Sequence, residues 1–145
     1  MLRKVDGMDP ENTRPDFTGL WETNFKRSTL RAPAPKRIVI RIEHQEPRLI
    51  QEILVTDAGG SGQRLTFQYE TGAETLNAVG NSTARTRARW EGTEFVIEST
   101  MEAHGREFHF KDHWSLSGDG QTLTMAHRDD DLAGQISVLE RIRLA

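Results

Sequence analysis

The sequence predicts an all-β protein, an antiparallel up-and-down meander that closes into a barrel of about eight to ten strands. From Phe17 to Leu144 no stretch carries the i, i+3, i+4, i+7 apolar pattern of an amphipathic helix, whereas apolar and polar residues alternate at period two in segment after segment. The connections are short and contain glycine, which favours pairing between strands that are neighbours in the sequence. Closing such a meander into a barrel removes its free edges.

The alternating segments give the order of the elements along the chain. Residues 1–16 mix charges with prolines and follow neither period, so we expect a mobile arm there and a single barrel domain over residues 17–145. The expected strands cover residues 18–25, 36–45, 48–57, 62–70, 83–91, 93–103, 106–117, 121–129 and 134–143, with a short piece near 74–79.

Turn signals predict which strand residues face each other, because a two-residue turn fixes the register of a hairpin. The strongest signals are Asp119-Gly120, Glu91-Gly92 and His104-Gly105. The first turn pairs Asp112 with His127. The second pairs Ala88 with Phe95 and Thr86 with Ile97, and the third pairs Met101 with Phe108. All three turns agree on one inner face, which we extend to the last strand as Ile136, Val138, Glu140 and Ile142.

Composition excludes several classes of protein. The chain of 145 residues has no cysteine, which excludes disulfides, thiolate metal sites and cysteine nucleophiles and fits a reducing compartment. Nineteen basic and twenty-two acidic residues give a charge of -3, so nothing favours binding to nucleic acid or to an anionic membrane. No apolar run approaches the roughly 20 residues of a membrane-spanning helix. No apolar stretch of a secretory signal follows Met1, and we therefore expect a cytoplasmic protein.

The inner face predicts a binding cavity, because it combines apolar side chains with a few polar ones. A barrel of about eight strands is just wide enough to be filled by side chains or to hold one small ligand, and both outcomes are open. We expect a small apolar or aromatic ligand, no cofactor, no metal, and a monomer or homodimer. The candidate ligand-binding residues are His44, Phe67, Tyr69, Trp90, Phe95, Phe108, Phe110, Trp114, Met125 and Glu140.

The pair Asp112 and His127 has two interpretations. In the first, the carboxylate and the imidazole satisfy each other where the barrel opens to water. In the second, the carboxylate orients the imidazole as a proton-transfer group over the cavity, and the protein is a cofactor-free isomerase, cyclase, lyase or hydrolase with His127 and Asp112 as catalytic residues. No nucleophile elbow, phosphate loop or metal-ligand spacing accompanies the pair.

Phe17-Thr18-Gly19-Leu20-Trp21 resembles the Gly-x-Trp opening of the lipocalin-like (calycin) barrels. Pro33-Ala34-Pro35-Lys36, Ile42-Glu43-His44, Trp114-Ser115-Leu116-Ser117 and Gly120-Gln121-Thr122-Leu123 are similar to segments of uncharacterised bacterial lipocalin-like proteins of about this length. The resemblance implies that Trp21 lies across the closed end of a barrel under an arginine of the last strand, Arg141 or Arg143. It also implies small-molecule binding in the barrel.

Overall fold

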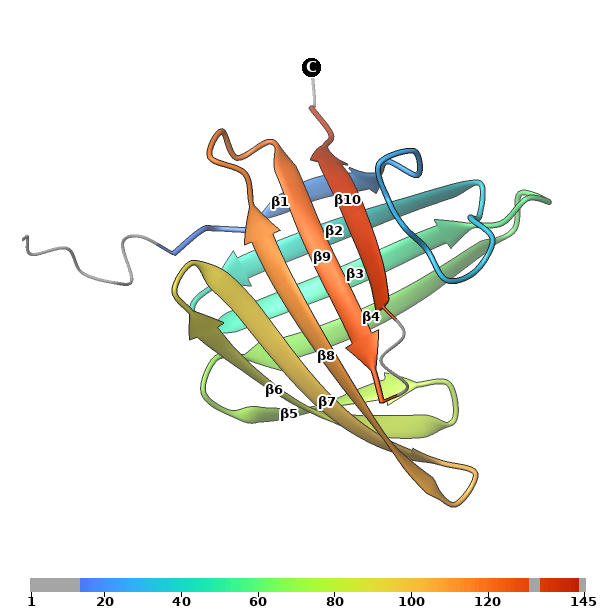
Figure 1. The fold of residues 1–145 in the computed structure, drawn as a ribbon, viewed down its shortest axis with the longest axis vertical. Helices are drawn as coiled ribbons and strands as arrows, with labels where there is room; N and C mark the ends of the chain where they lie inside the picture. The colour runs from blue at the N-terminus through green and yellow to red at the C-terminus, as the bar shows by residue number, and fades with distance from the viewer. Residues whose placement is uncertain (1–13, 131–133, 144–145) are drawn as a thin grey trace, which may run out of the picture.

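The computed structural model describes residues 14–130 and 134–143, which form ten β-strands (Figure 1). Within this part of the chain no helix is long and apolar enough to cross a membrane. Most of the expected arm, residues 1–13, lies outside the described residues. The strands are β1 (Gly19–Thr23), β2 (Arg37–Gln45), β3 (Arg48–Thr56), β4 (Gly62–Glu70), β5 (Glu74–Val79), β6 (Ser82–Glu91), β7 (Glu94–Ala103), β8 (Arg106–Leu116), β9 (Thr122–Asp129) and β10 (Gly134–Arg141).

The ten strands form one antiparallel sheet in the order β4-β3-β2-β1-β10-β9-β8-β7-β6-β5. Each strand pairs with the next strand in the sequence, except that β4 has no backbone ladder with β5. In addition, the first strand, β1, pairs with the last, β10. The sheet curls into a nearly closed barrel, as Figure 1 shows. The predicted all-β meander is therefore confirmed, and the short piece near 74–79 is a full strand.

A side chain bridges the gap between β4 and β5. The Asn77 Oδ1 atom accepts a hydrogen bond from the backbone nitrogen of Gln68 at 2.7 Å, and its Nδ2 donates to the backbone oxygen of Gln68 at 2.9 Å. Asn77 is 4% exposed. Its amide thus makes the two hydrogen bonds that a residue of a paired strand would make with its backbone.

Two of the three predicted hairpin registers are confirmed, and one needs correction. Asp112 faces His127, and Met101 faces Phe108. In the third hairpin Trp90, not Ala88, faces Phe95. The reason is that Glu91 pairs with Glu94 as part of the ladder, so the turn begins at Gly92, whose φ of 63° suits a hairpin turn. The register shifts by two residues, which leaves every side chain on its predicted face.

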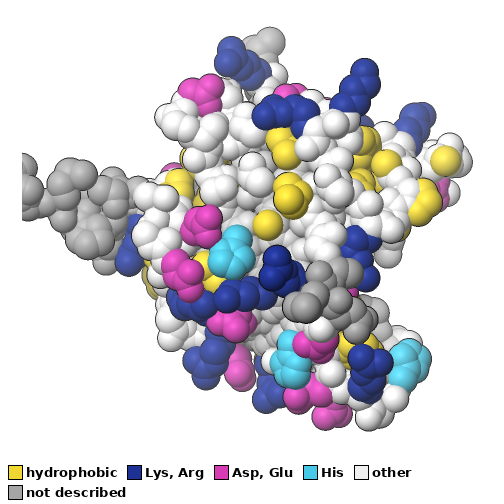
Figure 2. Space-filling view, viewed as in Figure 1, with side chains coloured by type: hydrophobic (Ala, Val, Ile, Leu, Met, Phe, Trp, Pro, Cys, Tyr) yellow, Lys and Arg dark blue, Asp and Glu magenta, His cyan; other side chains and the backbone are white. Residues whose placement is uncertain are grey.

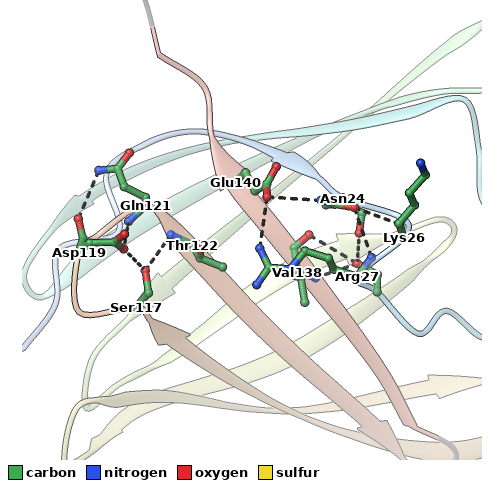
Figure 3. A network of polar contacts seen from close by, with 10 residues as sticks. Asn24, Lys26, Arg27, Ser117, Asp119, Gln121, Thr122, Val138 and Glu140 are labelled. Carbon is green, nitrogen blue, oxygen red and sulfur yellow. Dashed lines mark hydrogen bonds and ion pairs between the residues drawn. The ribbon is translucent and has the colours of Figure 1, made fainter.

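The predicted inner face of β10 is wrong. Gln135, Ser137 and Leu139 point inward, whereas the Glu140 side chain is 53% exposed and pairs outside with Arg27 at 3.2 Å (Figure 3). Val138 also lies on the outer face, where the segment of residues 24–28 covers it and shares its backbone hydrogen bonds. The apolar alternation of this strand therefore follows an outer contact and not the barrel interior.

One end of the barrel is closed by a packed core around Trp21. Trp21 is 0% exposed, its Nε1 donates to the Phe17 carbonyl at 3.0 Å, and the Arg141 guanidinium lies 4.3 Å above its ring centroid. Arg141 also donates to the carbonyl oxygens of Gly120 at 3.0 Å and Thr18 at 2.9 Å. The arginine of the last strand is thus Arg141 and not Arg143.

A candidate ligand-binding cavity

The half of the barrel away from Trp21 holds a cavity of about 690 Å³. Its walls come from β1 to β4, from β6 to β10 and from the end of β5, and the segment between β1 and β2 contributes Arg31 and Ala32. The aromatic side chains therefore do not fill the interior completely. The larger apolar side chains of the wall are Ile38, Ile40, Ile53, Phe67, Met101, Phe110, Trp114 and Met125.

Gln51 and Tyr69 form the first polar group of the cavity. Both side chains line it, and the Tyr69 hydroxyl donates to the Gln51 Oε1 atom at 2.9 Å. The two residues are 5% and 8% exposed, respectively. Burial, and secondarily the negative charge of Asp112, raise the pKa of Tyr69 above its usual value, so the phenol keeps its proton.

Asp112 and His127 form the second polar group. The predicted cross-strand pair is confirmed, with 2.7 Å between Asp112 Oδ1 and His127 Nδ1. The imidazole stacks on Phe110 at a centroid distance of 5.6 Å. The hydrogen bond to Asp112 raises the pKa of His127 against the opposing effect of burial. Both side chains line the cavity, and the exposed fraction is 24% for Asp112 and 33% for His127.

Arg31 and Ala32, from the segment between β1 and β2, line the cavity on its side away from Trp21, which we call its mouth. This segment is attached to β10 by a bridge between Thr29 and Ile136, and Arg31 forms an ion pair with Asp129 at the end of β9. Among the described residues, no three His, Asp or Glu side chains gather as the ligands of a metal ion would.

The structure places the candidate residues in several different regions. The cavity is lined by Phe67, Tyr69, Phe110, Asp112, Trp114, Met125 and His127. His44, Trp90 and Phe95 pack instead around Phe17 at the closed end, with ring centroids 5.6 to 6.1 Å from its ring. Phe108 lies on the β7–β8 hairpin, at the lower right of Figure 1, under the Arg106 guanidinium at 4.8 Å, and Glu140 lies outside.

His44 has its ring nitrogens engaged at the closed end. Its Nδ1 accepts from the Phe17 backbone nitrogen at 3.2 Å, and its Nε2 lies 2.6 Å from Glu46. Glu46 also accepts from the Trp90 indole at 3.1 Å. His44 therefore connects parts of the closed end and does not face the cavity.

The sequence reasoning missed Gln51, Arg31, Gln135 and Ser137. A signal for Gln51 was present, since Glu46-Pro47 leaves Gln45 opposite Arg48, and this register carries Gln51 to the position facing the inward Ile42. For Gln135 and Ser137 the apolar pattern of β10 pointed to the other face. Arg31 lies between strands, where neither period applies.

Comparisons with known proteins add evidence on the fold. No protein-family model and no curated protein sequence matches this chain. A secretory abundant heat soluble protein from Ramazzottius varieornatus superimposes with a TM-score of 0.65 at 10% identity, covering 90% of this chain and 98% of that one. The wild-type fluorescent protein UnaG superimposes with a TM-score of 0.59 at 15% identity, covering 87% and 97%. With the closed end built from Gly19, Trp21 and Arg141, this agreement shows that the chain has the lipocalin-like (calycin) barrel fold.

Proposed function

We propose that this protein binds one small, mainly apolar organic molecule inside its barrel. The observation that supports the proposal most directly is the cavity of about 690 Å³, whose walls combine aliphatic and aromatic side chains with a few converging polar groups. Ligand pockets of proteins have this size and this composition. The closed end supports the proposal as well, because its packed core holds the barrel together without using the space of the cavity.

The proposal includes the setting in which the protein works. We place it in the cytoplasm as a monomer or homodimer, without a nucleic-acid or membrane partner. The cysteine-free sequence fits a reducing compartment. On the face shown in Figure 2, basic and acidic side chains are interspersed, whereas nucleic-acid binding uses clustered basic residues.

A second candidate function is cofactor-free proton transfer on the bound molecule. The observation that favours it is the 2.7 Å contact between Asp112 and His127 at the cavity wall, since a carboxylate on one ring nitrogen orients the other as an acid or base. If His127 acts in this way, His127→Ala lowers the turnover of a substrate found by screening by about 10²–10⁴-fold while ligand affinity changes little. A binding protein shows no turnover, and the same substitution changes affinity alone.

Uptake of an apolar fluorescent dye tests the binding proposal. We expect the wild-type protein to bind the dye and to melt at a higher temperature in its presence, because the dye binds only the folded state. Ser137→Phe places a phenyl ring inside the cavity and is expected to abolish uptake.

Ser115→Phe is the matched control, since Ser115 lies on the outer side of β8 next to the inward Trp114 and outside the cavity lining. Equal dye binding by the wild-type protein and Ser137→Phe, or no binding by either, contradicts the proposal.

A further inference from the structure

Gln51 lines the cavity, and its amide has a donor that no described residue uses. Its Oε1 accepts from Tyr69, whereas no described residue accepts a hydrogen bond from its Nε2. Gln51 is 5% exposed, so water does not freely solvate this group. An unsatisfied buried donor destabilises a folded protein, and a donor of this kind in a cavity wall is suited to a ligand that supplies the acceptor.

The orientation of the amide follows from Tyr69. A phenol that keeps its proton needs an acceptor, and Gln51 Oε1 is the acceptor within 2.9 Å. Turning the amide round would leave the phenol proton without an acceptor among the described residues and would expose a carbonyl oxygen in place of the NH₂ group. The free atom is therefore Nε2.

The charges around Gln51 decide which acceptor suits it. The negative charge of Asp112 acts on the neighbouring Tyr69 and disfavours a second negative charge there. The basic side chains of the cavity wall already have acidic partners, His127 with Asp112 and Arg31 with Asp129. A carboxylate beside Gln51 would lose its hydration without gaining an unpaired cation, which is costly in a buried site. A neutral carbonyl avoids this cost.

We propose that the cavity selects ligands with a neutral carbonyl group, a ketone, ester or amide, that accepts a hydrogen bond from Gln51 Nε2. The apolar remainder of the ligand extends toward the mouth, between Ile38, Ile53 and Phe110. Carboxylates of the same shape are rejected. This inference rests on the proposed binding function and specifies the chemical class of the ligand.

Three probes with one skeleton test the inference: benzylacetone, in which a methyl ketone ends the chain, butylbenzene, in which a methylene replaces the carbonyl, and hydrocinnamate, in which a carboxylate replaces the ketone. Affinities are measured at pH 7.5 by displacement of the apolar dye. We expect Gln51→Met to weaken benzylacetone about tenfold and to leave butylbenzene unchanged or tighter, because one buried hydrogen bond is lost. We expect wild-type protein to bind benzylacetone at least tenfold more tightly than hydrocinnamate, and Asp112→Asn to narrow this difference.

Gln63→Met is the matched control, because Gln63 lies exposed on β4 and outside the cavity lining. An equal effect of Gln51→Met on both neutral probes, tighter binding of hydrocinnamate than of benzylacetone, or dye uptake without competition by benzylacetone overturns the inference and leaves the binding proposal intact. Failure to take up the dye overturns both. If Gln51→Met does not fold, the comparison of benzylacetone with hydrocinnamate on the wild-type protein still tests the inference.

Discussion

The residues of the closed end depend on one another for their conformations. Gly19 has a φ of 149°, which favours glycine, and a Cβ atom there would meet the Arg141 guanidinium. The missing side chain therefore lets Arg141 cross from β10, reach the Thr18 carbonyl and cover Trp21. The conformations of Gly19 and Arg141, which are far apart in the sequence, therefore depend on each other. This explains why the short Gly-x-Trp motif is informative about the fold.

At this scale we expect Trp21→Ala to lower the free energy of unfolding by about 3–5 kcal/mol, the range for truncating a large buried aromatic side chain. Trp21 is 0% exposed and loses its packing, its hydrogen bond to Phe17 and the Arg141 contact together. Urea unfolding measures the change. Trp90→Ala, at a partly buried position, is the comparison and is expected to lose less. A loss below about 1 kcal/mol for Trp21→Ala would contradict this account of the closed end.

The Asp112–His127 pair makes stability depend on pH. Because Asp112 raises the pKa of His127 above its unfolded value of about 6.5, the pair stabilises the folded state fully below that pH. This contribution is lost as the pH rises through the folded pKa of His127. We therefore expect the stability difference between wild-type protein and Asp112→Asn to shrink above about pH 6.5 in urea unfolding.

The double variant provides the control. With His127→Gln in the background, Asp112→Asn is expected to have an effect without this pH dependence, since no imidazole is left to titrate. A stability difference that stays constant or grows with pH, or the same dependence in the His127→Gln background, would show that another group is responsible.

At the scale of elements, the hairpins were readily predicted and the two irregular junctions were not. The turn residues of a hairpin predict its register. His104 and Gly105 are an example, because both have a positive φ, 56° and 72°, as a type I′ turn requires. The sequence between Asp129 and Gly134 contains no Asn-Gly or Asp-Gly turn signal, so only the apolar pattern of β10 was available for a prediction. That pattern reflects the contact of Val138 with segment 24–28 on the outer face. No sequence signal predicts the open junction between β4 and β5, because the burial of Asn77 and its bonds to Gln68 are visible only in the structure.

Asn77 should control how firmly that junction is held. Asn77→Ala removes both hydrogen bonds to Gln68, each worth about 0.5–1.5 kcal/mol, so we expect destabilisation of about 1–3 kcal/mol. Amide hydrogen exchange in β5 should accelerate at the same time. Asn81→Ala, in the neighbouring exposed turn, is the matched control. Unchanged exchange in β5 would mean that the sheet edges are held mainly by other contacts.

At the scale of the whole molecule, period-two alternation distinguished the inner face of the barrel from the outer face. It did not distinguish one end of the barrel from the other. Phe95 and Phe67 follow the same pattern, yet one is fully buried at the closed end and the other lines the cavity. The position of a residue along the barrel axis depends on how the ten strands are staggered. This stagger is the sum of the register shifts at every turn. The sequence therefore predicted the fold and the pair Asp112 and His127, but it could not separate cavity residues from core residues.

The pairing of β1 with β10 has a practical consequence for attaching the protein to other objects. Trp21 lies opposite Arg141, so the chain enters β1 and leaves β10 at the closed end, whereas Arg31 and Gln135 mark the opposite rim. A surface anchor or fusion partner joined at residue 14 or at residue 143 would thus extend away from the mouth. Arrays of this barrel immobilised by either end would present every mouth to the solution, an orientation suited to a sensor chip.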